Sequence, residues 1–317
     1  SSAGLNLTTA ANTIAIGHDS MGLGVVVGDS NIAIGESAGY DLTEGADNIF
    51  VGTKAGGNAT NNTFNIAIGH DAFHASVNDG DKNIAVGYES MGTDDVSGAS
   101  NIAVGSKTLK ALTTGVTNIA VGSGSIGIGV VTGNDNIAVG NFALEDLTSG
   151  GNNIAIGSGS LTSATDNIGN VAIGFESLKT SANDGDKNVA IGFQAMKTGD
   201  VSGDNNIALG SSALDDLTSG TDNVAIGTSA ALNLTTGTAN IAIGHEVMAT
   251  GITTGNNNVA IGNSPGVDLT AGTENVFIGT QAGTNATDNE DNIAIGNQAL
   301  KTSANDGDKN IAIGTGA

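Results

Sequence analysis

The stretch Asn136-Ile137-Ala138-Val139-Gly140 decides the fold, because close copies of it recur from one end of the chain to the other. Each copy ends on a glycine, and successive closing glycines lie 17 or 18 residues apart. A period this regular is typical of solenoids and related repeat architectures. The closing glycines are Gly17, Gly35, Gly52, Gly69, Gly87, Gly105, Gly122, Gly140, Gly157, Gly174, Gly192, Gly210, Gly227, Gly244, Gly262, Gly279, Gly296 and Gly314.

Each position of the copy admits few residue types. Asn stands four residues before the glycine in every copy except the first, which has Thr13. Ala stands two before it, except at Phe50 and Phe277, and the two remaining positions are always Ile, Val or Leu. Because side chains alternate between the faces of a strand, this pattern predicts a short β-strand in each unit.

The rest of the unit carries apolar residues and turn signals. A small residue often stands three after the closing glycine and an apolar one four after it, as in Ala143-Leu144. Many 17-residue units add a Leu seven after it, and a turn glycine follows at ten or eleven. A unit of this length cannot hold a helical crossover, so neighbouring strands must stack in parallel. The sequence predicts an all-β parallel β-solenoid or β-roll of about 18 coils, forming a single continuous repeat domain over 1–317 and a segment of a longer fibre.

The same pattern leads to an expectation about the faces of the strands. We expect Ile154 and Ile156 to point into the coil, because branched apolar side chains normally form the core. Ala155 would then lie on the opposite face, against the backbone of a neighbouring chain. Asn153 would belong to a column of asparagines that bond one another from coil to coil.

Composition excludes several functional classes. The net charge is −23, with nine basic residues, so the chain would repel nucleic acid and anionic membrane surfaces. Cysteine is absent, which excludes disulfides and thiolate metal sites. No apolar run approaches the ~18 residues of a membrane span. We therefore expect neither nucleic-acid binding nor membrane insertion.

Residues that could carry chemistry are few. Three of the four histidines, His18, His70 and His245, directly follow a closing glycine, where an exposed turn is expected, and the fourth is His74. We predict no enzyme, no cofactor and no catalytic, cofactor-binding or metal-binding residue. One alternative stays open: the repeated Asn-Asp-Gly-Asp-Lys-Asn loops could be plain turns or could offer oxygen ligands to calcium. Their acidic residues are Asp79, Asp81, Asp184, Asp186, Asp306 and Asp308.

The repeat resembles two families. Asn65-Ile66-Ala67-Ile68-Gly69 is similar to the Asn-x-Ala-Ile-Gly repeat in the head domains of YadA-like trimeric autotransporter adhesins, whose units are shorter. Gly296-Asn297-Gln298-Ala299-Leu300 and Leu234-Thr235-Thr236-Gly237 resemble the repeats of phage-type tail fibre proteins. The resemblance covers nearly the whole chain. It implies a trimeric, elongated fibre located outside the cell or on a virion surface.

The leading hypothesis is a structural fibre protein, a trimeric β-solenoid shaft of a phage tail or virion fibre, with receptor attachment left open. The alternative is a bacterial cell-surface adhesin or an extracellular matrix filament. An ice-binding solenoid is less favoured, because the threonines vary between units instead of forming a regular row. The expected partners are further copies of the chain, as a homotrimer or end to end, and a host or cell-surface glycan or protein.

Overall fold

A computed structural model describes residues 3–4, 7–22, 25–74, 80–93, 95–127, 129–179, 185–199, 201–251, 253–301 and 307–317. The chain divides into two compact units, Ser1–Ser158 and Gly159–Ala317. Each unit is a stack of coils with one short strand per coil, and the described residues form no helix. The fold is an all-β parallel β-solenoid of about 16–18 coils, which confirms the fold class predicted from the repeat.

Each repeat copy forms a strand. The strands of the first unit are β1 (Ile14–Ile16), β2 (Ile32–Ile34), β3 (Ile49–Val51), β4 (Ile66–Ile68), β5 (Ile84–Val86), β6 (Ile102–Val104), β7 (Ile119–Val121), β8 (Ile137–Val139) and β9 (Ile154–Ile156). Those of the second are β10 (Val171–Ile173), β11 (Val189–Ile191), β12 (Ile207–Leu209), β13 (Val224–Ile226), β14 (Ile241–His245), β15 (Val259–Asn263), β16 (Val276–Ile278), β17 (Ile293–Ile295) and β18 (Ile311–Ile313).

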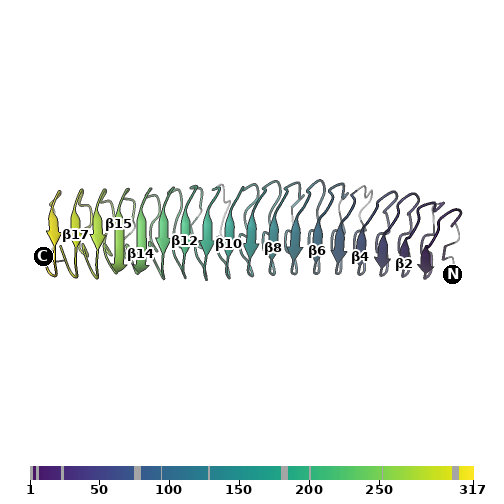
Figure 1. The fold of residues 1–317 in the computed structure, drawn as a ribbon, viewed down its shortest axis with the longest axis horizontal. Coiled ribbons are helices and arrows are strands. Elements are labelled where there is room, and N and C mark those ends of the chain that lie inside the picture. Colours follow the sequence, from purple (N-terminus) through teal and green to yellow (C-terminus); the bar gives the residue numbers. More distant parts are fainter. Residues whose placement is uncertain are drawn as a thin grey trace. The chain divides into compact units, whose positions relative to one another are not determined.

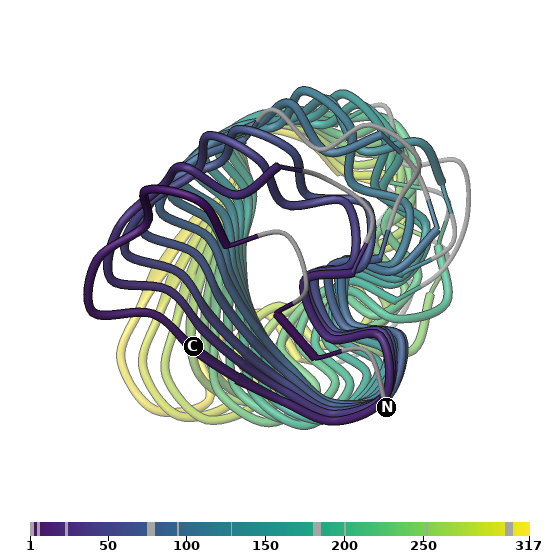
Figure 2. The same ribbon diagram turned by 90° about the vertical axis from the view of Figure 1, so that its right-hand side faces the viewer.

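Within each unit the strands pair in parallel and in chain order (Figure 1). The register places equivalent residues side by side, so that Ala120 of β7 pairs with Ala138 of β8. Viewed along the stack, the successive coils of a unit lie over one another around a shared interior (Figure 2). Every repeat position therefore becomes a column of like residues.

The strand faces are the reverse of the sequence expectation. Ala155 and Asn153 are fully buried inside the coil, whereas Ile154 is only half-buried and Ile156 is 39% exposed. The prediction that Ile154 and Ile156 point into the coil is therefore wrong. So is the placement of Ala155 outside the coil, because its column lines the interior of its own chain.

The opposite wall of the coil explains why the buried strand residue is small. Leu144 and Leu147, which follow the closing glycine of β8 by four and seven residues, are fully buried. These side chains already occupy the interior of a thin coil, so the strand can contribute only small residues there. The expected core role of the second Leu is confirmed in every 17-residue unit that carries it. These residues are Leu42, Leu112, Leu147, Leu217, Leu234 and Leu269, all fully buried.

The predicted asparagine column is confirmed, and it is buried. The backbone N–H and the side-chain Nδ2 of Asn153 both donate to Oδ1 of Asn136, each at 3.0 Å. Nδ2 of Asn136 also donates to the carbonyl of the turn residue Gly150 at 2.9 Å. Each asparagine thus joins its own coil to the neighbouring strand and to a neighbouring turn. Satisfying the amide in this way removes the cost of burying it.

Each coil before the last also turns three corners with left-handed backbone. In the coil of β8 they are Asp135, Phe142 and Leu144, with φ of 58°, 57° and 51°. Such conformations are uncommon for residues other than glycine. Here they persist because the corner N–H groups bond the neighbouring coil: that of Phe142 donates to the Ser123 carbonyl at 3.0 Å. The sequence pattern predicts turns in this region but does not predict their handedness.

The closing glycine is required for space. A Cβ added to Gly122 would lie 2.3 Å from the carbonyl oxygen of Gly140 in the next coil, and the φ of Gly122 is 133°. No L-amino acid side chain fits there without moving the backbone. This close approach explains why glycine closes every copy of the repeat.

Phe50 and Phe277 replace the buried Ala of their strands, and glycines make room for both rings. A Cβ on Gly39 or Gly56 would lie 3.1 or 2.6 Å from the Phe50 ring. Each of these glycines stands four residues after a closing glycine. Gly39 belongs to the coil before that of Phe50, and Gly56 belongs to the same coil as Phe50. Phe277 has the equivalent neighbours Gly266 and Gly283. No other unit carries glycine at this position.

Because glycines make room for a phenylalanine ring in the interior, the loss of stability caused by a new phenylalanine should be recovered by adding glycines beside it. Ala138→Phe alone should destabilise the first unit by about 1–3 kcal/mol, because the interior is already filled by Ile126 and Leu144. Adding Ile126→Gly and Leu144→Gly should recover much of that loss, since these positions correspond to Gly39 and Gly56. Urea unfolding of the single and triple variants would measure both effects. A triple variant less stable than the single one would contradict this account of the interior.

A second prediction concerns the asparagine column. Asn118→Ala removes the acceptor of the Asn136 N–H and Nδ2 groups and the donor to the Gly133 carbonyl. Buried groups left unbonded cost about 1–3 kcal/mol each, so unfolding should become markedly easier. Hydrogen exchange of the Asn136 amide should accelerate. The exposed Asn297→Ala serves as the control and should change neither quantity.

Candidate functional site

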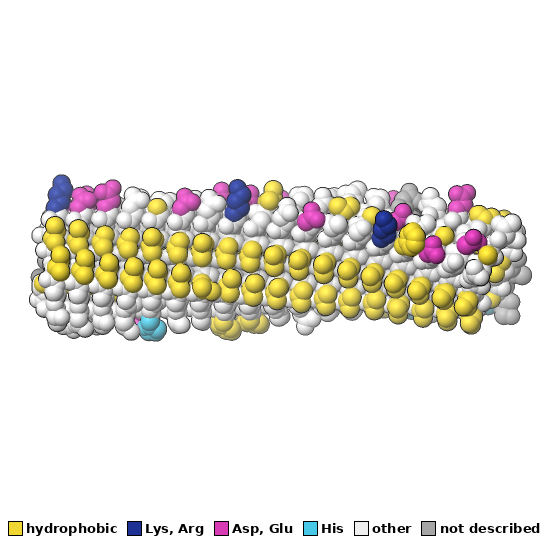
Figure 3. All heavy atoms as spheres, viewed as in Figure 1, with side chains coloured by type: hydrophobic (Ala, Val, Ile, Leu, Met, Phe, Trp, Pro, Cys, Tyr) yellow, Lys and Arg dark blue, Asp and Glu magenta, His cyan; other side chains and the backbone are white. Residues whose placement is uncertain are grey.

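The most extensive surface feature is an apolar face on the outside of each sheet. We call the first and third residues of the strands, which point away from the interior, the Ile/Val face. Figure 3 shows them as two adjacent rows of hydrophobic side chains. Every residue in these two columns is Ile, Val or Leu, so no charge interrupts them. The more exposed members are Ile14, Ile16, Ile34, Ile68, Val104, Val139, Ile156, Ile207, Leu209, Ile241, Ile311 and Ile313.

Such a face is unusual for a chain that remains alone in water. Contiguous apolar patches beyond a few hundred Å² generally mark surfaces that bind a protein or another apolar partner. The columns here extend along each unit with one pair of side chains per strand, about 4.8 Å apart. This face is not predicted by the repeat when its branched residues are assigned to the core on hydrophobicity alone.

Two pairs of exposed rings form a second feature. Phe175 and Phe193, each directly after a closing glycine, stack with ring centroids 5.5 Å apart and planes inclined by 16°. They are 46% and 53% exposed. His70 and Tyr88 occupy the same column in the first unit, with centroids 5.6 Å apart. An aromatic residue directly after the glycine in two consecutive units is the sequence signal that identifies such a pair.

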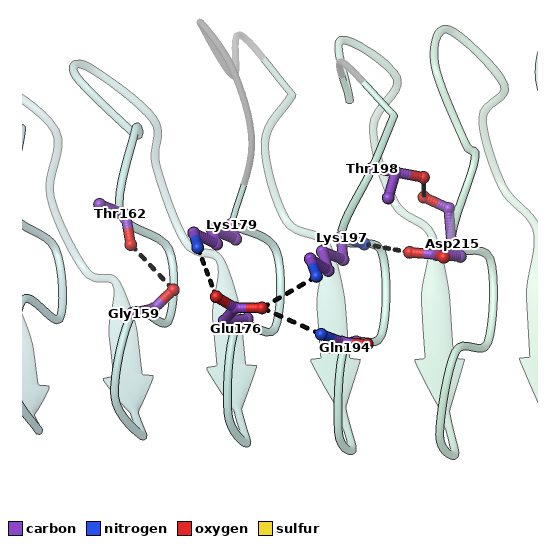
Figure 4. Close-up of polar contacts among 8 residues, drawn as sticks. All are labelled: Gly159, Thr162, Glu176, Lys179, Gln194, Lys197, Thr198 and Asp215. Carbon is purple, nitrogen blue, oxygen red and sulfur yellow. Dashed lines mark hydrogen bonds and ion pairs between the residues drawn. The ribbon is translucent and has the colours of Figure 1, made fainter.

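A network of charges is centred on Glu176, the residue that follows Phe175 in the sequence (Figure 4). Glu176 accepts a hydrogen bond from Lys179 of its own coil, and its Oε2 lies 2.9 Å from Nζ of Lys197 in the next coil. Gln194 Nε2 donates to the same oxygen at 3.0 Å. The side chain of Glu176 is only 16% exposed. Glu89 and Lys110 repeat the arrangement in the first unit, at 2.7 Å.

The network lowers the pKa of the Glu176 carboxyl group. Hydrogen bonds from Lys179, Lys197 and Gln194 lower the pKa of Glu176 to about 2, from the usual 4.5. A lowered pKa in the folded state stabilises the fold above the ordinary carboxyl value, and that contribution is lost as the pH falls toward 2. The cluster therefore acts as a clamp that joins two neighbouring coils.

This clamp gives a pH-dependent prediction. Glu176→Gln should be less stable than the wild type at pH 6, and the difference should shrink as the pH falls from 4.5 toward 2. Thermal unfolding across that range would measure it. Glu246→Gln, an exposed residue at the same position of another coil, is the control and should change stability little. If the wild type were still more stable than Glu176→Gln by the same amount at pH 2, the ionised Glu176 carboxylate would not be the source of the stabilisation.

The histidines predicted to lie in turns are on the surface. Nδ1 of His18 lies 3.1 Å from Asp19, and that of His70 lies 2.9 Å from Asp71, each pair being adjacent in sequence. His245 lies 3.7 Å from Glu246, and His74 is half-buried in another coil. Among the residues that the structure describes, no three His, Cys, Asp or Glu side chains gather as a metal would require.

The acidic loops are described only in part. Asp79, Asp184 and Asp306 lie outside the described residues. Their partners Asp81, Asp186 and Asp308 each accept a backbone N–H from the preceding coil, from Thr63 at 2.7 Å, Ile168 at 2.7 Å and Glu290 at 2.9 Å. One oxygen of each carboxylate therefore has a structural role in holding two coils together. The absence of a metal-binding residue stays a prediction, with calcium at these loops as its open alternative.

These three aspartates belong to a wider pattern that the sequence analysis did not identify. An Asp or Asn two residues before the column asparagine bonds the preceding coil in seven of the eight 18-residue units. Ala99 occupies the position in the eighth. The 17-residue units have neither Asp nor Asn at this position. The length of a unit and the residue type two before its column asparagine therefore vary together. This correlation is the sequence signal that could have predicted the hydrogen bond to the preceding coil.

The sequence matches no family model and no curated protein. In the part of the chain that the structure describes, no helix is long and apolar enough to cross a bilayer. The surface of the molecule is therefore the guide to its function.

Proposed function

We propose that the chain is a structural fibre protein, a homotrimeric β-solenoid shaft of a phage tail or virion fibre located outside the cell or on the virion surface. The Ile/Val face is the observation that carries this proposal. The proposal includes no enzymatic activity, no cofactor, no nucleic acid and no membrane insertion. Attachment to a glycan or protein on a host or cell surface would be a further role of such a shaft.

The first supporting argument is energetic. Complete burial of a Val or Ile side chain contributes about 1.5–3 kcal/mol, and the partly exposed members of the Ile/Val face would gain a fraction of that amount. Each coil adds two such residues to the same two columns. The gain therefore accumulates with the number of coils, as a shaft requires. Because the interior of each coil is already filled, this surface remains available to another chain.

The second argument concerns symmetry and charge. The columns are two residues wide, so a strip from each chain fits around a shared axis when the chains lie parallel. Elsewhere the chain is strongly acidic, with a net charge of −23. Repulsion between the acidic surfaces would limit lateral association to the uncharged face. The resemblance of the repeat to trimeric adhesin heads and tail fibres favours three copies.

The second candidate is a bacterial adhesin or matrix filament, which would use the same shaft. The exposed Phe175–Phe193 pair favours some surface contact, because exposed rings are common in binding surfaces. Sequence on either side of the chain would separate the two candidates. A segment that binds a phage baseplate would support the first, and an outer-membrane anchor would support the second.

The trimer gives a direct prediction. Sedimentation equilibrium of the wild type at micromolar concentration should give three times the mass of the chain. Val121→Lys with Val139→Lys should release monomers, since charges on the Ile/Val face would be buried at the interface. Circular dichroism of those monomers should still show β-structure, because neither side chain enters the coil.

The matched control places the same charges elsewhere in the first unit. Ser123 and Ser158 are exposed and lie outside the Ile/Val face. Ser123→Lys with Ser158→Lys should remain trimeric. A wild type that stays monomeric at micromolar concentration would overturn the trimer. Equal dissociation of both double variants would show that net charge, and not the face, governs assembly.

A further inference from the structure

The first unit contains a hollow on its surface that none of the features above explains. Its volume is about 450 Å³, which lies in the range of small-ligand sites. The side walls come from Lys107 and Lys110 in one coil and from Phe142 and Glu145 two coils further along. Gly124 and Gly127, in the coil between them, line the hollow.

The two glycines explain why the hollow exists. They stand two and five residues after the closing glycine, positions that carry side chains in most coils. Figure 4 shows these columns occupied in the second unit, by Glu176 and Lys179 in one coil and by Gln194 and Lys197 in the next. Only the coil closed by Gly122 has glycine at both positions. The Phe142 ring of the next coil lies over Gly124, where an added Cβ would come within 2.9 Å of two ring atoms. The two glycines therefore leave room for this ring and for the hollow beside it.

The walls of the hollow differ in chemistry. On one side, Lys110 pairs with Glu89 at 2.7 Å. Lys107 is exposed and forms no direct ion pair with any described residue, although, after the hydrogen bond from Lys110, its positive charge also helps to lower the pKa of the Glu89 carboxyl. Its ammonium group therefore keeps hydrogen-bond donors for a ligand. On the other side lie the ring of Phe142, which is 48% exposed, and the half-buried Glu145. Burial raises the pKa of the Glu145 carboxyl above its usual value.

We propose that this hollow binds one residue of an acidic sugar, a pyranose that carries a carboxylate. The carboxylate would accept hydrogen bonds from the Lys107 ammonium group, which are the strong charge-assisted kind. The apolar face of the pyranose would lie against the Phe142 ring. Sugar hydroxyls at the opposite end would donate to the Glu145 carboxyl. An anion without a sugar ring would use only the first of these contacts.

The chemistry of both walls selects this class of ligand. A neutral sugar would offer no negative charge to the Lys107 ammonium group, and a simple anion would not cover the exposed part of the Phe142 ring, which is 48% exposed. In a chain with only nine basic residues, two of them line this single hollow. The assignment deepens the proposed function, because it gives the shaft a receptor chemistry. It does not depend on trimer formation for its geometry, since all of the lining residues belong to one unit.

The test uses methyl β-glucuronide as the probe, with methyl β-glucoside and acetate as comparisons. Ligand-observed NMR on the full chain should detect binding of the glucuronide, with weaker signals from the other two. Lys107→Gln and Phe142→Ser should each weaken glucuronide binding about tenfold, as expected when a charge-assisted bond or a stacking surface is lost. Lys54→Gln is the matched control, because Lys54 is exposed at the same position of another coil, and it should bind normally.

Three results would overturn the proposal. They are glucuronide binding no tighter than acetate binding, equal effects of Lys107→Gln and Lys54→Gln, and the absence of binding to a folded wild type. Sedimentation of the same samples reports separately on the fibre. A monomer that binds the glucuronide would refute the trimer and support the hollow, whereas a trimer that binds no glucuronide would do the opposite.

Discussion

The hydrogen bonds of the buried asparagine column are the constraint on which the rest of the structure depends. Asn136 and Asn153 are bonded through both backbone and side chain, and Asn136 reaches the turn at Gly150 as well. An amide with so many partners has to face the interior, because only there do a neighbouring strand and a neighbouring turn come within reach. Alternation along the strand then places Ala155 inside and its two isoleucines outside. The apolar outer face is therefore a consequence of the polar inner column.

Much of the fold could be predicted from the sequence, because a strict period allows few architectures. The repeat predicted parallel strands, the asparagine column and the buried leucines, and the structure has all of them. The faces were wrong because hydrophobicity was treated as the deciding criterion, whereas hydrogen bonding decides which side of Asn153 and Ala155 is buried. The site was harder to predict. Surface rings such as Phe175 follow from local sequence, but a hollow beside Gly124 depends on what neighbouring coils contribute, and the repeat pattern averages such differences away.

The alternation of unit lengths also has a physical basis. A unit of 18 residues has one residue more to place in its outer turn than a unit of 17. Asp81 and Asp186 show how that residue is accommodated, because a carboxylate two positions before the column asparagine accepts an N–H from the preceding coil. Both lengths therefore leave the next strand in the same register. Insertions are absorbed at the turn, and the strand column remains undisturbed.

The fit of Phe50 between Gly39 and Gly56 limits how a gene of this kind can grow. Repetitive genes lengthen when recombination copies whole units, and most coils here could be copied singly. The coil of Phe50 could not be moved alone to another part of the chain, because its ring also lies against Gly39 of the coil before it. Inserted singly between other coils, it would place a phenylalanine over a larger residue such as leucine or methionine. The smallest piece that can be transferred without a clash therefore contains two coils, so the packing of one ring sets the minimum length of DNA that such a gene can exchange.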